Sequence, residues 1–334
     1  MANNNKKGNA FTNNPIVKAI GTQRLIALLA LIVVFTFFCL LSPAFRQYST
    51  FVSIFDASYY IGLMAIGITF VIITGGIDLS IGTVLVCSSL VSGYLVTSKG
   101  VPVVAGIIIG ILIGFVFGTA NGLMVSIMGL PPFIASLGTM MISKGLGSII
   151  TKAQSVTWPQ MGAAGGGFRN VFRTTVGTTI IPTGLILMVV LAVVMSIVLN
   201  KTRPGRYILA LGSNKEATRL SGVNVVKWET LAYIFSGTFA GLAGVSYAAT
   251  YSTLLPGGGA GFELDAIAGV VIGGTSMSGG VGSIAGTMIG VFIMSVLKTG
   301  LPFIGLQPHW QQFITGIVLI VAVFADVVNR RKKN

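Results

Sequence analysis

The sequence predicts an all-α, polytopic membrane protein. Of its 334 residues, 53% are hydrophobic and only 8% are charged, whereas a soluble domain carries roughly a quarter charged residues. A membrane-spanning helix needs about 20 mainly apolar residues, and the stretches without any acid or base that exceed this length include 100–143, 174–200, 230–262 and 266–297. This composition excludes a soluble globule, and its apolar content also excludes an intrinsically disordered chain.

The apolar runs and their breaks predict about ten transmembrane helices. They are expected at 24–43, 53–73, 80–98, 102–128, 132–151, 179–200, 228–250, 264–281, 283–299 and 310–328. The segment 264–281 is the weakest of these because it is short and interrupted by glycines, and a partial span is the alternative there.

Basic residues orient these spans. Because cytoplasmic loops are enriched in Lys and Arg, three clusters should be cytoplasmic, and even numbers of spans separate them as this requires. The clusters are Lys6, Lys7, Lys18 and Arg24; Lys201, Arg203, Arg206, Lys215, Arg219 and Lys227; and Arg330, Arg331, Lys332 and Lys333. The expected organisation is therefore a cytoplasmic tail at 1–23, a transmembrane domain at 24–329 with a cytoplasmic loop at 201–227, and a basic cytoplasmic tail at 330–334. The loops 152–178 and 251–263 fall on the outer side.

The net charge of +14 does not predict nucleic-acid binding, because the basic residues mark loops rather than one basic face with interleaved aromatics. Cys39 and Cys87 lie inside apolar runs and are interpreted as small buried hydrophobes. The sole histidine, His309, has no partner set for zinc or for nucleophilic catalysis. The chain also lacks a G-x-x-x-x-G-K-[ST] phosphate loop. It is therefore expected not to be an enzyme and to carry no metal or cofactor of its own, with any ATP bound by a partner.

Two glycine-rich segments place polar residues between apolar runs, at 74–82 and 272–280. Broken helices are tolerated at membrane depth only where they face protein or a water-filled cavity, so these segments are expected to border a translocation path. The expected path residues are Asp78, Ser80, Asn121, Thr275 and Ser276. For Asp78 and Ser80, capping of the following helix is favoured over direct substrate contact.

A similar motif occurs twice and indicates an internal repeat. Gly-Thr-Ala-Asn-Gly at 118–122 runs on to Gly-Leu-Pro-Pro-Phe-Ile at 129–134, and Gly-Thr-Met-Ile-Gly at 286–290 runs on to Gly-Leu-Pro-Phe-Ile at 300–304. These runs fall in the fourth and ninth spans, which cross the membrane in opposite directions. A five-plus-five inverted repeat, a known transporter plan, is therefore possible on the sequence.

The cytoplasmic loop contains signals for a short helix. Ser213 and Glu216 have the spacing of a capping box at a helix start, and Gly222 is placed to end the helix after about two turns. A short charged helix between two spans is a poor core element but a good contact for a soluble partner. An ordinary solvated connector is the simpler alternative.

Three runs together resemble the ribose-type sugar ABC importer permeases. They are Gly-Gly-Ile-Asp-Leu-Ser-Ile-Gly at 75–82, Gly-Ser-Asn-Lys-Glu-Ala-Thr-Arg-Leu-Ser-Gly-Val-Asn-Val at 212–225, and Glu-Leu-Asp-Ala-Ile-Ala at 263–268, which leads into Gly-Gly-Thr-Ser at 273–276. The resemblance covers nearly the whole chain. It implies the multi-pass permease subunit of a bacterial inner-membrane importer, which dimerises with a second copy or a close relative.

The resemblance also implies partners and roles. An extracytoplasmic sugar-binding protein would deliver a monosaccharide, and a cytoplasmic ATP-binding subunit would drive its transport. The coupling segment to that ATPase would comprise Ser213, Glu216, Ala217, Arg219 and Gly222, and Glu263 and Asp265 would belong to an outer-side gate or a binding-protein contact. The sugar itself is left open.

Two other functional classes stay open on the sequence. An ion-coupled secondary transporter of a small polar solute would place ionisable residues within its spans, and the candidates are Asp78, Lys144, Asp265, Lys298 and Asp326. A membrane scaffold or receptor subunit without transport is the second alternative. Transport by the chain alone in ATP-free vesicles, or the absence of any transport with its partners, would distinguish these from an ABC permease.

Overall fold

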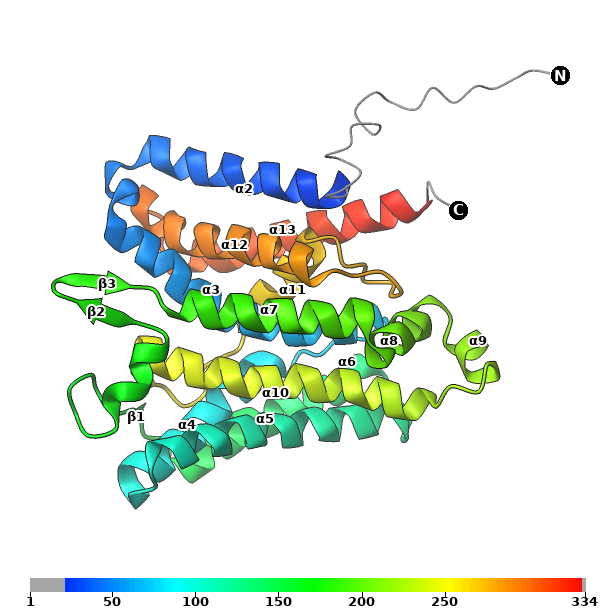
Figure 1. Ribbon diagram of the computed structural model, residues 1–334, viewed down its shortest axis with the longest axis horizontal. Helices are drawn as coiled ribbons and strands as arrows, with labels where there is room; N and C mark the ends of the chain where they lie inside the picture. Colours follow the sequence, from blue (N-terminus) through cyan, green and yellow to red (C-terminus); the bar gives the residue numbers. More distant parts are fainter. Residues whose placement is uncertain (1–21, 332–334) are drawn as a thin grey trace.

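The computed structural model describes residues 22–331 as a bundle of helices that lie nearly antiparallel (Figure 1). The basic residues predicted at 6, 7, 18, 332 and 333 lie outside the described part. The α-helices are α2 (Thr22–Leu41), α3 (Tyr48–Ile73), α4 (Ile81–Lys99), α5 (Val103–Ser126), α6 (Pro132–Ile150), α7 (Gly184–Lys201), α8 (Arg203–Ser213), α9 (Lys215–Leu220), α10 (Val225–Tyr251), α11 (Phe262–Ile272), α12 (Ile284–Gly300) and α13 (Pro308–Arg331).

Short elements join these helices. The 3₁₀ helices are η1 (Pro43–Arg46), η2 (Gly166–Val171) and η3 (Leu301–Ile304), and the strands are β1 (Val156–Thr157), β2 (Thr174–Val176), β3 (Thr179–Ile181) and β4 (Thr253–Leu254). β2 and β3 form a hairpin, and β1 pairs antiparallel with β4 through Val156 and Leu254. The two predicted outer loops therefore meet at one end of the bundle.

Nine helices in the described residues are long and apolar enough to cross a membrane, which confirms the multi-pass all-α prediction. The predicted span at 264–281 is different. Only α11, with 11 residues, is helical there, and glycine-rich segments without regular helix precede and follow it. The span predicted at 179–200 also starts later, at Gly184, because β3 occupies 179–181.

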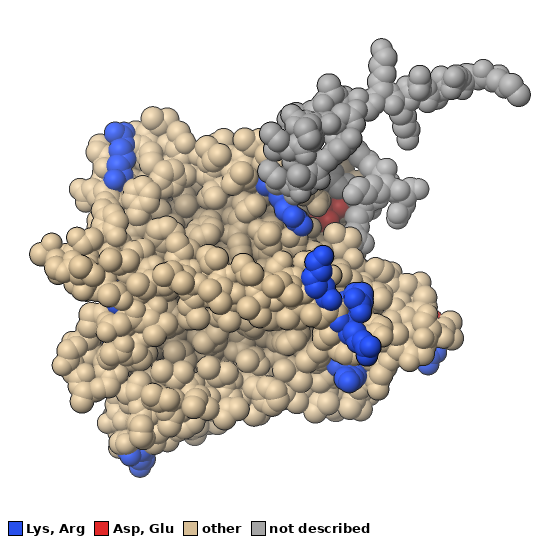
Figure 2. All heavy atoms as spheres, in the orientation of Figure 1, with Lys and Arg blue, Asp and Glu red and all other residues tan. Residues whose placement is uncertain are grey.

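The basic side chains are distributed unevenly between the two ends of the bundle. α8 and α9 lie at the same end as the first residue of α2 and the last residue of α13 (Figure 1), and the β2–β3 hairpin lies at the opposite end. Figure 2 shows Lys and Arg side chains gathered around the α8 end. The described parts of the three basic clusters therefore lie at one end of the bundle, as the even numbers of spans require, and the positive-inside rule predicts that this end is cytoplasmic.

α3 and α10 form the centre of the bundle. The apolar part of α3 is completely buried, whereas the most apolar windows of α2 and α13 are 11% and 0% buried. Leu40, Ile149 and Ile320 are among many large apolar side chains that point outward. In a membrane this is the stable arrangement, because lipid rather than water surrounds the outer helices.

Glycines allow the backbones of α5 and α10 to touch. Gly110, Gly114 and Gly118 lie one turn apart on α5 and face Gly237 and Gly241 on α10, so that a side chain on Gly114 would overlap the carbonyl of Gly237. Small residues at such interfaces are the usual device of helix packing in lipid, where van der Waals contact replaces the hydrophobic driving force.

The helix order agrees with the possible inverted repeat. In each half a long central helix, α3 or α10, is followed by a glycine-containing loop, at 74–80 or 252–261, and then by α4 or α11. The next helices, α5 and α12, cross in opposite directions (Figure 1). The matching glycines, however, face different partners. Gly118 and Gly122 pack on α10, whereas Gly286 and Gly290 pack on α11. The sequence motif therefore marks equivalent helices but not equivalent contacts.

We expect Gly114→Val to separate α5 from α10, because its side chain would have to displace backbone on α10. Overpacking of this kind typically costs about 1–3 kcal/mol. The variant should show a lower thermal midpoint in detergent, measured by size-exclusion chromatography after heating. Gly138→Val on α6 is the matched control, because the space around Gly138 is open. Equal midpoints for the two variants would contradict this account of the α5–α10 contact.

Candidate translocation and coupling sites

A buried polar cluster surrounds Asp78 in the loop before α4. The Asp78 Oδ1 atom accepts hydrogen bonds from the Ser80 N–H at 3.0 Å and the Ser80 hydroxyl at 2.6 Å, and lies 3.3 Å from Asn121 Nδ2. Its Oδ2 atom accepts from the Ser236 hydroxyl on α10 at 2.8 Å. The Thr139 hydroxyl on α6 donates to Asn121 Oδ1 at 2.5 Å. The cluster therefore joins α4, α5, α6 and α10.

The cluster brings together three of the five predicted path residues, Asp78, Ser80 and Asn121, and all three are buried. Asp78 accepts the backbone N–H of Ser80, which precedes α4, and no described side chain caps the N–H groups of the first turn of α4; the predicted capping by Asp78 is therefore replaced by a turn that holds the loop before the helix. Ser80 precedes the first residue of α4 but makes no side-chain cap bond, so a cap at Ser80 was the wrong expectation. Its hydroxyl instead donates to Asp78. Ser236 and Thr139 were not foreseen, because no local pattern connects them to Asp78.

Thr275 and Ser276 lie elsewhere, in the glycine-rich segment after α11. The Ser276 hydroxyl donates to Asp326 on α13 at 2.7 Å, and Thr275 Oγ1 accepts from the Ser283 N–H at 3.3 Å. Both residues are buried. The predicted path residues thus form two groups, one at each glycine break, and each group holds its break against neighbouring helices.

Glu263 and Asp265 lie in the first turn of α11, near the outer ends of α10 and α12. Asp265 forms an ion pair with Lys298 on α12 at 2.6 Å and accepts from the Thr315 hydroxyl on α13 at 3.3 Å. The Lys298 ammonium also lies 4.9 Å from the centre of the Phe262 ring. Glu263 Oε1 accepts from the Gly261 N–H at 2.9 Å. Both acids are buried, so neither is exposed at the outer surface in this conformation.

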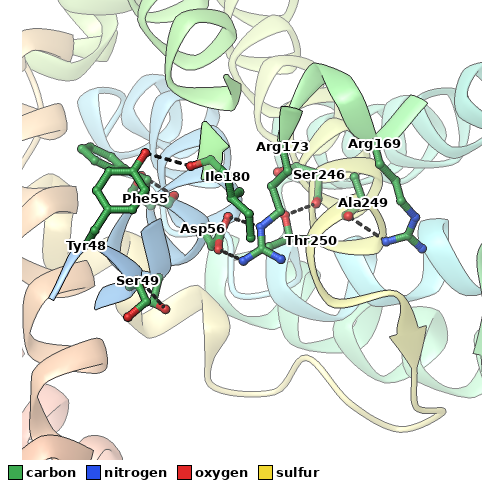
Figure 3. A network of polar contacts seen from close by, with 12 residues as sticks. Tyr48, Ser49, Phe55, Asp56, Arg169, Arg173, Ile180, Ser246, Ala249 and Thr250 are labelled. Carbon is green, nitrogen blue, oxygen red and sulfur yellow. Dashed lines mark hydrogen bonds and ion pairs between the residues drawn. The ribbon is translucent and has the colours of Figure 1, made fainter. Parts of the chain in front are cut away.

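Two arginines fasten the outer loop onto the helices (Figure 3). Arg173 pairs with the buried Asp56 on α3, with its Nε atom 3.0 Å from Asp56 Oδ1. Arg169 donates to the carbonyl oxygen of Ala249 at 2.8 Å, near the end of α10. Trp158 is fully buried and donates to the Ser89 carbonyl at 3.0 Å. The loop at 152–178 is therefore packed against the bundle through these three side chains.

The predicted coupling segment forms the short helix α9, but its cap differs from the prediction. Ser213 is the last residue of α8 and donates to the Leu209 carbonyl, so the predicted capping box with Glu216 does not form. Asn214 caps α9 instead, accepting from the Ala217 N–H at 2.9 Å. Asparagine is as good an N-cap as serine. Because α8 extends through Ser213, the residue left to cap α9 is Asn214.

The rest of α9 agrees with the expectation. Gly222 follows the C-cap residue Ser221 and has a φ of +79°, a conformation that glycine adopts readily and that ends many helices. Arg219 bonds Glu216 at 2.6 Å on the exposed face and lowers the pKa of that carboxyl. Exposed pairs of this kind contribute little to stability. Leu220, which the sequence did not single out, is 78% exposed at the end of α9.

No group of three or more His, Cys, Asp or Glu side chains that could hold a metal occurs within residues 22–331. Two acids on the spans, Asp56 and Asp265, form ion pairs with Arg173 and Lys298. The arrangement can position helices and present hydrogen-bonding groups to a polar solute.

Comparison with known proteins identifies the family. The profile described as "Branched-chain amino acid transport system / permease component" matches residues 50–323. The chain is 38% identical to a ribose import permease protein of Bacillus subtilis over 93% of this chain and 94% of that protein. It is 32% identical to a galactose/methyl galactoside import permease protein of Haemophilus influenzae over 87% and 90%. It is 33% identical to a fructose import permease protein of Bifidobacterium longum over 90% of each chain.

No solved structure matches the chain. The family match covers the two glycine breaks, the outer loops and α9, and the relatives extend over nearly all of the ten predicted passes. This is a multi-pass protein of the bacterial inner membrane. The chain belongs to the ABC importer permease family that includes these three sugar import permeases.

Proposed function

We propose that this chain forms the translocation path of an ABC importer for a monosaccharide. An extracytoplasmic binding protein delivers the sugar, and a separate ATPase subunit drives its transport. The observation that carries the proposal is the similarity, over about nine tenths of the chain, to import permeases for ribose, galactose and fructose. The sequence lacks a phosphate loop, which supports a separate ATP-binding subunit.

In this proposal α9 is the contact with the ATPase. It lies at the tip of the cytoplasmic end (Figure 1) and presents exposed Leu220, Glu216 and Arg219, with Ala217 and Gly222 fixing its start and its end. An exposed apolar side chain on a short charged helix is suited to a groove on a soluble partner.

The coupling segment is also packed against both glycine breaks. A side chain on Gly212 would overlap the carbonyl of Ile73 at the end of α3, and the Gly280 N–H donates to that same carbonyl at 2.9 Å. Ser213 lies directly beside Gly280. Movement of α8 and α9 would therefore reach the breaks that hold Asp78, Thr275 and Ser276 without passing through a flexible linker.

In this proposal the translocation path is lined by residues at and near the two glycine-rich breaks. Asp78, Ser80, Asn121, Thr275 and Ser276 have their polar atoms paired within this chain in the present conformation, so they would meet the sugar only when the breaks rearrange. A second permease copy, or a close relative, would cover part of the exposed apolar surface and complete the path. Lipid would cover the remainder.

At the outer end the burial of Glu263 and Asp265 favours a gate over a binding-protein contact. The surface available to a docked binding protein is the β2–β3 hairpin and its surroundings, where Val176 and Ile181 are exposed. Tyr48 on α3 donates to the Ile180 carbonyl at 2.8 Å (Figure 3). Contact on the hairpin would therefore be passed directly to α3.

The burial of Asp78 is the observation that favours testing the alternative function, an ion-coupled transporter. Asp78 is buried without a cationic partner among the residues the structure describes, and buried acids in transporters often carry protons. Uptake by the chain alone under an ion gradient would support that alternative. A scaffold without transport is the remaining outcome.

The proposed function can be tested with the importer purified from its native membrane through a tag on this chain. We expect an ATPase to co-purify. Proteoliposomes should take up radiolabelled D-ribose, D-galactose or D-fructose only with ATP on the ATPase side and the binding protein on the other. Uptake without ATP under an ion gradient would contradict the proposal. A failure of all three sugars in a complex with stimulated ATP hydrolysis would reject the monosaccharide assignment.

The coupling role predicts a defect from proline at Thr218. The Thr218 N–H makes the first helical hydrogen bond of α9, to the Asn214 carbonyl at 3.1 Å, and proline would remove it. Thr218→Pro should reduce ATPase co-purification and stimulated hydrolysis while membrane insertion stays normal. Glu216→Pro should be milder because Glu216 is in the first turn, where proline is tolerated. Thr218→Ala is the side-chain control, and wild-type coupling in Thr218→Pro would make α9 a simple connector.

Asp78 allows a structural role to be separated from proton carriage. Asp78→Leu would leave the Ser80 N–H and the hydroxyl groups of Ser80 and Ser236 without their acceptor, and each buried unsatisfied group typically costs about 1–3 kcal/mol. The thermal midpoint should therefore fall clearly. Asp78→Asn retains an acceptor and the same shape, so its midpoint and ATP-driven uptake should stay near wild type. Loss of uptake in Asp78→Asn with an unchanged midpoint would indicate that the charge itself takes part in transport.

A further inference from the structure

A cavity of about 490 Å³ opens between the start of α11, the end of α12 and the start of α13. Small-molecule sites typically have volumes of about 300–1,000 Å³, so this space is large enough for a small solute. Phe262 on its wall lies 5.6 Å, centre to centre, from the ring of Tyr247, one turn before the end of α10. Lys298 belongs to the last turn of α12. The cavity therefore lies near the outer ends of the spans.

The wall of the cavity combines polar and apolar groups. Thr315, Gln311 and Gln312 come from one side of α13, and the Asp265–Lys298 pair joins α11 to α12. The apolar part consists of Leu264, Leu297, Leu301, Ile314 and Phe262. Sites that bind small polar solutes have this composition, in which a few placed hydrogen-bonding groups lie within an apolar wall.

The charges in this wall are already neutralised. Lys298 donates to Asp265 at 2.6 Å and lies over the rings of Phe262 and Tyr60 at 4.9 and 5.5 Å, and such cation–π contacts stabilise a partly desolvated ammonium. A single carboxylate that is already paired is a poor cation site, and a paired ammonium is a poor anion site. What the wall offers is hydrogen bonding from neutral groups and from the ion pair, which suits an uncharged polyhydroxylated molecule.

The position of the cavity requires a polar occupant. Gln312 is exposed and Gln311 is half-buried, on a span whose other exposed residues include Phe313, Ile317 and Ile320. Amide groups and an ion pair that opened onto lipid would carry a large desolvation cost. Because α11 is a short helix after a glycine-rich segment, its start is also the kind of break that membrane proteins place beside water.

On these grounds we propose that the cavity is an outer binding site for the monosaccharide in transit, with Gln312, Thr315 and Lys298 as the side chains that contact its hydroxyl groups. This inference rests on the proposed function, because it gives the transported sugar a site within the permease. The Asp265–Lys298 pair then has two roles. It fixes α11 against α12, and it presents its remaining hydrogen-bonding atoms to the sugar.

The test uses cysteine accessibility in the full importer. Cys39 and Cys87 are first replaced by serine, and Gln312→Cys is compared with Phe313→Cys. These neighbours lie on the same helix and both are exposed, but only Gln312 lines the cavity. A membrane-impermeant methanethiosulfonate added from the outside should modify Gln312→Cys and leave Phe313→Cys largely unmodified. A thiol that faces lipid or a tightly packed partner reacts slowly, because the reactive species is the thiolate.

Protection identifies the ligand. D-ribose, D-galactose and D-fructose are added separately, and glycine betaine at equal concentration is the osmolyte control. At least one sugar should slow the modification of Gln312→Cys by about fivefold, which corresponds to about 80% occupancy of the site. No modification of Gln312→Cys, or equal slowing by betaine and by all three sugars, would overturn the inference.

A second pair of variants uses transport as the readout. Gln312→Leu and Thr315→Val should lower the uptake rate at saturating sugar-loaded binding protein by about fivefold each, the typical effect of one lost hydrogen bond. The binding-protein concentration for half-maximal uptake should stay unchanged. Thr315→Ser, which keeps the hydroxyl, should restore uptake. Wild-type rates in both variants would overturn the site while leaving the importer intact, whereas a wild-type complex that transports no sugar would instead reject the proposed function.

Discussion

The rest of the structure depends on one constraint: within the membrane, every backbone polar group must find a partner inside the protein. Helices satisfy it automatically, and this chain departs from helix in its interior mainly at the two glycine-rich breaks. At the first break, the Gly75 and Gly76 N–H groups donate back to the end of α3, and Asp78 accepts the Ser80 N–H. At the second, Ser276 and Val281 bond through their backbones. The breaks are therefore fixed structural elements.

The two breaks are also fixed to each other. The Gly280 N–H donates to the carbonyl of Ile73, so the segment after α11 closes the orphan carbonyl at the end of α3. Gly212 of α8 packs on the same carbonyl, where a larger residue would not fit. The carbonyl of Ile73 thus brings together the end of α3, the segment after α11 and the end of α8. Glycine is needed at this point because three backbones approach one another within van der Waals distance.

Local sequence patterns predicted most of the fold, because lipid-facing helices require long apolar runs and loops require charge. These patterns gave wrong helix bounds and caps where contacts distant in the sequence determine the structure. The apolar content of 264–281 could not show that the helix there ends at Ile272. Glycine-rich segments whose backbone groups bond neighbouring parts of the same chain are as apolar as a helix. Ser213 and Asn214 are both good caps, and the structure assigns the cap to Asn214 because α8 extends through Ser213.

The candidate sites show the same division. The sequence identified Asp78, Ser80 and Asn121 individually, but it could not show that they form one cluster with Ser236, which is 158 residues from Asp78. It also identified Asp265 and Lys298 as rare ionisable residues on spans, but their pairing across 33 residues and the contribution of Thr315 follow from packing alone.

α11 connects the proposed outer site to the proposed coupling segment. Its first turn carries Asp265 at the cavity, and its last residue leads into the segment that holds Ser276 and Gly280 against Asp326, Ile73 and α8. An 11-residue helix is only about 16 Å long, and it packs on α12 through Gly269 and Gly273 with backbone in contact. A helix so closely packed moves as a rigid unit rather than bending. Because α11 and α12 are packed backbone to backbone and the Asp265–Lys298 pair joins them, a displacement at the cytoplasmic end of α11 would move this pair relative to Thr315 on α13. Such a movement would give the proposed ATPase contact a direct physical route to the outer cavity.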